Sequence, residues 1–346
     1  MIRFECDYLE GAHPAIIEAL VRTNLEQTPG YGVDDYCESA KAKIRAAIGN
    51  ENLAVHFLVG GTQTNLSVIA AALRPWQGVL CADTGHIAVH ETGAIEATGH
   101  KVITLANQNG KITAEQIANF TDAHFADSTH EHMAQPGMVY LSQSTESGTL
   151  YSLKELQEIS RVCRERNLFL YIDGARLGYA LASVENDVSL GDLATLADVF
   201  TIGGTKVGAL FGEAIVIANP LIDRDFRYTI KQRGGMLAKG RLLGIQFDTL
   251  FTDNLYFEIS AHAMKLAVKI RTALREAGYA FYTESPTNQL FPLLKDEELE
   301  ALSNRYSFSV WANAGEGRTA VRICTSWATS EENADALIRD LKALRS

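Results

Sequence analysis

Two side chains of complementary chemistry, the carboxyl group of Asp173 and the amine of Lys206, each follow a short apolar run of the sequence. The runs 168–172 and 199–202 lack the alternation of a half-exposed strand, which indicates buried strands of a parallel sheet. Open α/β sheets bind their ligands at the carboxyl ends of the strands, where both side chains are expected. A carboxylate that pairs with a pyridine nitrogen and a lysine that forms an imine are what pyridoxal 5'-phosphate (PLP) requires of a protein. The alternative is two unrelated surface charges at strand ends.

A glycine-rich turn, Gly60-Gly61-Thr62, joins the first predicted strand to the helix after it. Glycine lets the backbone approach an anion closely, and the free amides and dipole at a helix start favour a phosphate group. No lysine follows the turn, which excludes a Walker loop, and the glycine spacing is not that of a dinucleotide-binding fingerprint. The turn therefore predicts a phosphate site. An ordinary glycine turn with Thr62 or Thr64 as the helix cap is the alternative.

Three further basic side chains fall near predicted strands. His86 follows the second predicted strand, with Glu91 about one helical turn later, so its imidazole is suited to stacking on an aromatic cofactor or to general base catalysis. A neutral histidine bonded within a loop is the alternative. Arg176, three positions after Asp173, suits a phenolate or phosphate oxygen, or else an exposed ion pair. Arg322 interrupts an apolar strand, where a guanidinium needs a partner such as a carboxylate.

The elements that must position these side chains alternate between strand and helix. Apolar runs predict seven strands, at 53–59, 79–82, 101–105, 138–141, 168–172, 199–202 and 214–217. Amphipathic segments between them, most clearly 153–166, predict crossover helices. This alternation predicts an α/β fold with a mostly parallel seven-stranded sheet and helices on both faces.

The pattern changes after about residue 250. A long helix is predicted over 254–277, then short alternating or apolar runs, then a final helix over 331–344 whose acidic start and basic end suit the helix dipole. We therefore expect residues 1–250 to form a large PLP-binding domain and residues 251–346 a smaller α+β domain.

The composition narrows the class of protein. Of 346 residues, 47% are hydrophobic and 21% charged, as in a soluble globular protein, and the formal net charge is −11. Such an acidic chain argues against nucleic acid or an anionic membrane as a partner. No run approaches the ~20 apolar residues of a membrane span, and the first residues lack signal-peptide features. Five scattered cysteines without a Cys-x-x-Cys pair fit reduced thiols, so we expect a cytoplasmic protein without a metal site.

Taken together, these residues resemble the threonine aldolase and β-eliminating lyase family, within the aspartate-aminotransferase-like PLP enzymes of fold-type I. The similarity runs from Phe4 to about Ser330. Its most specific parts are Gly60-Gly61-Thr62, His86 with Glu91, Asp173-Gly174-Ala175-Arg176, and Thr205-Lys206. Each part is short, and it is their common order and spacing that agrees with the family.

The resemblance implies a role for each residue around the cofactor. Lys206 forms the imine with PLP, and Asp173 pairs with the protonated ring nitrogen. His86 stacks on the ring, and Arg176 approaches the ring hydroxyl group. The phosphate group is held by Gly60, Gly61 and Thr62.

The resemblance also implies how substrate binds and how the protein assembles. Arg322 binds the carboxylate of a small amino acid substrate. Members of the family are homodimers or homotetramers with active sites at subunit interfaces. Tyr31, Lys231 or Lys239 is therefore expected to reach the cofactor of a neighbouring subunit.

Two segments depart from the family pattern. Many relatives have Ser-Asp-Thr-Val near the amino terminus, where this chain has Cys6-Asp7-Tyr8. Many have Glu-Asn-Thr-His after the fourth strand, where it has Gln143-Ser144-Thr145-Glu146, although a second branch of the family is similar to this chain there. We expect Cys6 and Glu146 beside the substrate, where they bear on its side-chain preference and on the identity of the base.

The activity that the resemblance implies is PLP-dependent cleavage of a β-hydroxy-α-amino acid of the threonine or allo-threonine kind. Scission of the Cα–Cβ bond gives glycine and an aldehyde. A base must take the proton of the β-hydroxyl group; His86 is the first candidate and Glu146 the second. β-Elimination, amino transfer and ligand binding without turnover are the alternatives.

Overall fold

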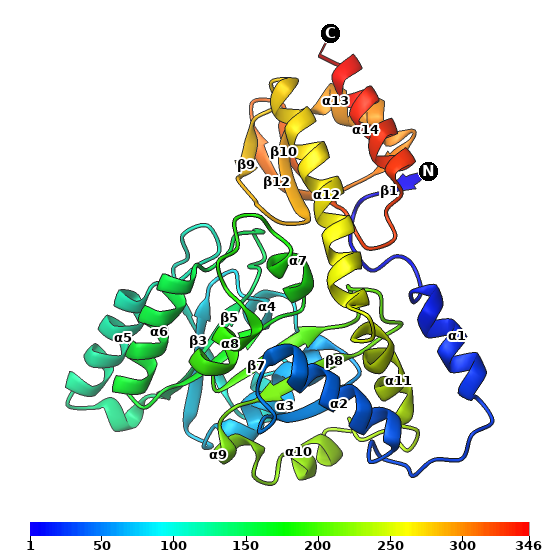
Figure 1. Ribbon diagram of the computed structural model, residues 1–346. Coiled ribbons are helices and arrows are strands. Elements are labelled where there is room, and N and C mark those ends of the chain that lie inside the picture. Colours follow the sequence, from blue (N-terminus) through cyan, green and yellow to red (C-terminus); the bar gives the residue numbers. More distant parts are fainter. Residues whose placement is uncertain (346) are drawn as a thin grey trace.

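A seven-stranded sheet forms the centre of the larger unit of this protein, whose computed structural model describes residues 1–345 (Figure 1). In sheet order its strands are β2 (Ala54–Leu58), β8 (Glu213–Ile217), β7 (Val199–Gly203), β6 (Phe169–Asp173), β5 (Gln135–Ser142), β3 (Gln77–Ala82) and β4 (Lys101–Leu105). Neighbouring strands are parallel except where β8 pairs with β2 and with β7. The predicted seven strands and the mostly parallel sheet are confirmed.

Helices cover both faces of the sheet, which explains why its strands are apolar on both sides (Figure 1). Along β7, for example, Phe200 and Ile202 belong to one core and Val199 to the other. The first core includes residues of α2 (Asp35–Ile48), α5 (Ala114–Ala126), α6 (Leu153–Glu165), α8 (Leu190–Leu196) and α11 (Arg241–Leu250). The second includes residues of α3 (Gly61–Ala72), α4 (His86–Val89), α9 (Pro220–Asp223) and α10 (Phe226–Gln232).

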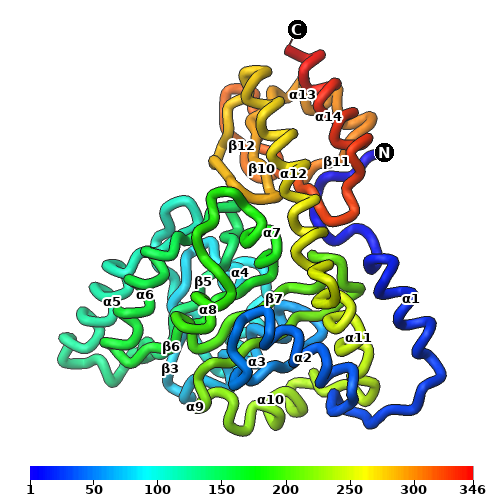
Figure 2. The backbone as a smooth tube through the Cα atoms, in the orientation of Figure 1, coloured from blue at the N-terminus to red at the C-terminus, as the bar shows by residue number. Residues whose placement is uncertain are grey.

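A smaller unit is built on a four-stranded antiparallel sheet. Its strands, in order, are β12 (Ser309–Gly315), β13 (Arg318–Cys324), β10 (Gln289–Lys295) and β9 (Phe281–Thr283), and its helices are α12 (Leu255–Glu276), α13 (Asp296–Ser303) and α14 (Glu331–Ala343). The short strand β1 (Ile2–Arg3) pairs with β11 (Tyr306–Ser307), so both ends of the chain lie in this unit (Figure 2).

The long helix α12 joins the two units, because it packs against α7 (Leu177–Leu181) at one end and α14 at the other. The domain boundary at about residue 250 stays a prediction. The remaining elements are α1 (Pro14–Thr23), which packs on α11, and the 3₁₀ turns Glu96–Thr98 and His130–His132. Over residues 1–345, none of the helices combines the length and the apolar character needed to span a bilayer.

Candidate active site

One cavity of about 530 Å³ lies where the carboxyl edge of the large sheet meets the small unit. That volume is ordinary for a small-molecule site. Most of the residues predicted from the sequence line it: Gly60, Gly61, Thr62, His86, Glu146, Asp173, Arg176, Lys206 and Arg322. Cys6 and Tyr31 are not among its lining residues.

Asp173, the last residue of β6, is buried and held by three donors. The Tyr140 hydroxyl donates to its Oδ2 at 2.6 Å and the Asn65 side-chain amide to the same atom at 3.1 Å. The Ala175 N–H donates to Oδ1 at 2.8 Å. Burial and the neighbouring Asp173 raise the pKa of Tyr140 well above its usual value, so the phenol keeps its proton and remains a donor. These contacts fix the carboxyl group toward the cavity.

Lys206 lies in the loop between β7 and β8, and β7 is the sheet neighbour of β6, which carries Asp173. Its carbonyl oxygen accepts a hydrogen bond of 2.5 Å from the Tyr179 hydroxyl, which anchors the backbone. Burial and the Arg176 guanidinium lower the pKa of the Lys206 amine. A lowered pKa favours the neutral amine, which is the nucleophilic form.

His86 opens α4 at the end of β3, and its imidazole is oriented by a buried carboxylate. Nδ1 lies 2.7 Å from Oε1 of Glu91, which also accepts a hydrogen bond from Asn65. Because a carboxylate only accepts, Nδ1 carries the proton, and in the neutral imidazole Nε2 is the acceptor. The pair predicted from the sequence is therefore in contact.

Glu146 also lines the cavity, next to His86. Its Oε1 accepts hydrogen bonds from the His86 backbone N–H at 2.9 Å and from the Ser142 hydroxyl at 2.7 Å. Burial raises the pKa of the Glu146 carboxyl, although these donors oppose the shift. A carboxyl group with a raised pKa is better matched to proton transfer near neutral pH.

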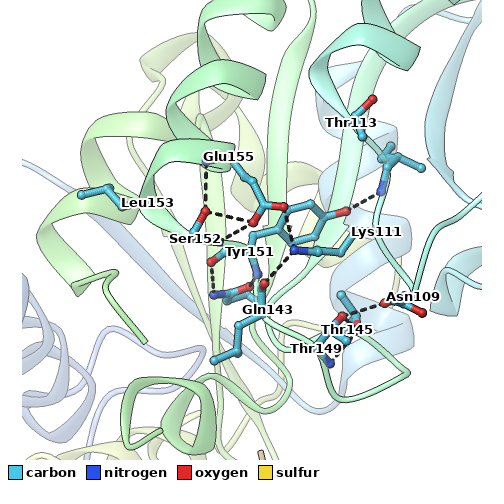
Figure 3. Close-up of polar contacts among 12 residues, drawn as sticks. Asn109, Lys111, Thr113, Gln143, Thr145, Thr149, Tyr151, Ser152, Leu153 and Glu155 are labelled. Atoms are coloured by element: carbon cyan, nitrogen blue, oxygen red, sulfur yellow. Dashed lines mark hydrogen bonds and ion pairs between the residues drawn. The ribbon is translucent and has the colours of Figure 1, made fainter. Parts of the chain in front are cut away.

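The segment that carries Glu146 is braced by polar contacts (Figure 3). The Gln143 side chain closes a ring with the backbone of Tyr151, donating to its carbonyl and accepting from its N–H at 3.0 Å each. The hydroxyl groups of Thr145 and Thr149 are 2.7 Å apart. A loop tied at both ends in this way holds the carboxyl of Glu146 in place.

Arg176 forms a bidentate pair with Asp7 inside the cavity wall, with Nε–Oδ2 and Nη2–Oδ1 distances of 2.7 and 2.9 Å. The Asn288 amide also donates to Asp7. Burial disfavours the charged form of each partner, but their attraction prevails, lowering the pKa of Asp7 and raising that of Arg176. The predicted approach of Arg176 to a cofactor hydroxyl stays a prediction.

The turn at the start of α3 leaves its first amides without a side-chain cap, whereas Asp34 caps α2 and Ser152 caps α6. A Cβ atom built at Gly60 or Gly61 would meet nothing within 4 Å, so the space beside the turn is open. Free amides beside open space at a helix start suit a phosphate group. Together with the lysine and the carboxylate, this cradle fits PLP.

Arg322 reaches the cavity from β13. One Nη donates to the Glu5 carbonyl at 3.0 Å, and the guanidinium lies 5.7 Å from the centre of the Trp311 ring. Its buried Nε has no partner among residues 1–345. A guanidinium that is positioned but not saturated is suited to an anionic ligand.

Cys6 and Tyr31 do not line the cavity. Cys6 is a half-buried free thiol, and Tyr31 is exposed with the Lys231 amine 4.8 Å from its ring centre. The expected place of Cys6 beside the substrate stays a prediction, and so does a role of Tyr31 at the substrate or cofactor of a neighbouring subunit. Within the described range 1–345, no group of three or more His, Cys, Asp or Glu side chains could hold a metal ion.

Sequence reasoning missed the side chains that orient Asp173, and it missed Glu213. Tyr140 and Tyr171 are buried within their strands. Because a buried phenol needs a polar partner, a tyrosine inside an apolar run is the sequence signal that could have indicated them. Tyr171 donates to Asn65 at 2.6 Å. Glu213 precedes an apolar run, but placing it at the site requires knowing that β8 runs antiparallel to β7.

Comparison with known proteins agrees with this geometry. The family model of the β-eliminating lyases matches residues 4–340. A low-specificity L-threonine aldolase of Pseudomonas aeruginosa is 30% identical over 345 residues, which are 98% of this chain and 97% of that protein. A solved structure of Leishmania major threonine aldolase is 43% identical with a TM-score of 0.97, and each chain is covered completely. An aspartate aminotransferase of Thermus thermophilus, 15% identical, shares the fold with a TM-score of 0.70 over 99% of this chain and 91% of its own.

The chain thus has the aspartate-aminotransferase-like fold, as the sequence predicted. Within that fold class, the chain belongs to the β-eliminating lyase family.

Proposed function

We propose that this protein is a PLP-dependent lyase that cleaves a β-hydroxy-α-amino acid of the threonine kind to glycine and an aldehyde. The observation that carries the proposal is the single cavity shared by Lys206, Asp173 and Arg322 in a member of this family. The relatives named as threonine aldolases support the choice of reaction.

Different residues of the chain would hold different parts of PLP. The uncapped start of α3 would take the phosphate group, Asp173 the ring nitrogen, and Lys206 the aldehyde carbon. His86, fixed by Glu91, would lie on the ring. When bound, PLP supplies an electron-withdrawing ring that stabilises negative charge at the substrate's Cα.

Arg322 would orient the substrate through its carboxylate. Its guanidinium is held by the Glu5 carbonyl and the Trp311 ring and keeps an unpartnered Nε. Fixing the carboxylate would hold the substrate in one orientation, and such positioning lowers the barrier to breaking one particular bond at Cα. The Arg322 side chain therefore selects which bond reacts.

The base for the β-hydroxyl proton is expected to be His86, whose Nε2 is the free acceptor. The His86→Phe variant keeps a flat ring but lacks the nitrogen, and it should lower aldehyde formation by on the order of 10²-fold or more. Glu146→Gln should lower it less. Steady-state rates of both variants, with His132→Asn as the exposed histidine control, check this assignment. Unimpaired His86→Phe with a slow Glu146→Gln would transfer the role to Glu146.

We propose in addition that the protein is a homodimer or homotetramer with interface active sites. In α1, Ile17 and Val21 are exposed apolar residues one helical turn apart, and Leu25 follows them just beyond the helix. Tyr31 is also exposed in the single chain. Sedimentation equilibrium tests this proposal, and a monomer at working concentration contradicts it.

The five cysteines are all free, in keeping with the proposed cytoplasmic location.

The reaction is tested by incubating the PLP-loaded protein with L-threonine and with L-allo-threonine. We expect acetaldehyde and glycine in equal amounts. Ammonia with an oxo acid would indicate β-elimination instead, and amino transfer to added pyruvate or 2-oxoglutarate would indicate an aminotransferase. A protein that is coloured by bound PLP but forms no product would be a PLP-binding protein without catalytic activity.

A further inference from the structure

The amino-terminal segment in which this chain departs from the family pattern reaches the cavity through Tyr8. Of the three residues Cys6-Asp7-Tyr8, Tyr8 lines the cavity, whereas Cys6 does not. Asp7 is completely buried. The sequence led us to expect Cys6 beside the substrate, and the structure offers the Tyr8 side chain in that segment instead.

The backbone just before Tyr8 is tied to the two arginines that line the cavity. The Glu5 carbonyl accepts a hydrogen bond of 3.0 Å from an Nη atom of Arg322. Asp7 accepts two hydrogen bonds from Arg176, at 2.7 and 2.9 Å. Because Tyr8 follows Asp7 directly, these contacts fix the start of its side chain beside both guanidinium groups.

The side chain of Tyr8 is accessible to a ligand. It is 53% exposed, and its hydroxyl group makes no hydrogen bond within residues 1–345. Burial of part of the ring and the nearby Cys6 thiol raise the pKa of the Tyr8 phenol, although Arg322 and Arg176 oppose the shift. The hydroxyl group therefore keeps its proton near neutral pH and can donate a hydrogen bond.

The charge beside Tyr8 matches a ligand with one anionic group. The bidentate contact with Asp7 compensates the charge of Arg176. Arg322 binds the Glu5 carbonyl, but no carboxylate within residues 1–345 pairs with it, and its buried Nε has no partner there. One uncompensated guanidinium and a neutral hydroxyl donor thus face the same cavity. A carboxylate can accept from both, because it has two oxygen atoms and only accepts.

We propose that Tyr8 is a substrate-binding residue whose hydroxyl group donates a hydrogen bond to the substrate's carboxylate, beside Arg322. The inference rests on the proposed function, in which Arg322 holds that carboxylate. Donors from two separate segments restrict a carboxylate more than a single guanidinium does. Because the carboxylate keeps its charge while the Cα–Cβ bond breaks, the contact should strengthen substrate binding more than it raises the rate of the bound substrate.

The test uses Tyr8→Phe, which removes the hydroxyl group and keeps the ring. The full-length, PLP-loaded protein is titrated with glycine and with methylamine, which is glycine without its carboxylate, and the absorbance of bound PLP reports binding. Tyr8→Phe should weaken glycine binding by about tenfold, as expected for a lost hydrogen bond to a charged group, and leave methylamine binding unchanged. The KM for L-threonine should rise by a similar factor, with kcat little changed.

The matched control is Tyr282→Phe, which removes a hydroxyl group of similar exposure from the small unit. Tyr282 lies in β9, is 50% exposed and does not line the cavity. This variant should bind glycine and methylamine as the wild type does. Because the Tyr8 hydroxyl group has no partner in the chain, neither substitution should disturb the fold, and a thermal melt of each variant checks this.

Unchanged glycine binding in Tyr8→Phe would overturn the proposal. A loss confined to L-threonine would also overturn it, because the hydroxyl group would then contact the substrate's side chain. An equal loss for glycine and methylamine would do the same, since it would indicate a disturbed cavity. A wild-type protein that binds neither amine would contradict the proposed function and this inference with it, so the two failures are distinguishable.

Discussion

Lys206→Ala is expected to abolish both aldehyde formation and covalent retention of PLP. Lys206 is the amine at the carboxyl edge of the sheet that lines the cavity. Its lowered pKa, caused by burial and Arg176, prepares it as a nucleophile. Loss of a covalent catalyst costs on the order of 10³-fold in rate or more. Product assays give the rate, and borohydride reduction followed by peptide mapping gives the attachment site.

The matched control is Lys154→Ala, which removes an exposed amine from α6. It should keep wild-type colour and rate. Because Lys206 is buried beside the like-charged Arg176, its removal should not unfold the chain, and a thermal melt checks this. Persistent covalent PLP in Lys206→Ala, mapped to another lysine, would contradict the assignment.

The strands were predictable where both of their faces are buried, because such strands consist of apolar residues. Strands β3, β5, β6, β7 and β8 are covered on both faces and appear in the sequence as apolar runs. The direction of β8 was not predictable, because an apolar run reads the same for a parallel and an antiparallel strand. That direction is what brings Glu213 to the active edge. Helix α11 was also missed, because its sequence follows the glycine-rich 233–236 without a capping residue.

The residues of the candidate site were predictable where a charged residue stands in an apolar stretch, since few roles explain a charge there. A charged residue that ends, follows or interrupts an apolar strand needs a partner or a function. The site residues of this kind are Asp173, Lys206 and Arg322. The contact between Arg176 and Asp7 was not predictable, since 169 positions separate them and only the folded chain brings them together. The same holds for Asn65, which links Glu91, Asp173 and Tyr171.

Asp173→Asn is expected to lower turnover by on the order of 10²–10³-fold while leaving covalent attachment of PLP to Lys206 intact. The carboxylate would pair with the ring nitrogen, and an amide cannot supply its negative charge. The substitution also mismatches the local donors. Tyr140 and Asn65 donate to Oδ2 and Ala175 to Oδ1, so the new NH₂ group must face a donor in either orientation. That mismatch costs about 1–3 kcal/mol of stability.

A control that separates the loss of charge from the loss of stability is a carboxylate outside the cavity whose two oxygens also accept hydrogen bonds, and the half-buried Asp198 provides one. It lies at the opposite edge of the same strand pair, where it accepts hydrogen bonds from the Leu170 N–H and the Asn219 amide at 2.7 Å each. Asp198→Asn should lower the melting temperature by a similar amount and leave the rate per bound PLP unchanged. If Asp173→Asn also kept its rate per bound PLP, the carboxylate would be structural, and the ring would have to draw its charge from another group.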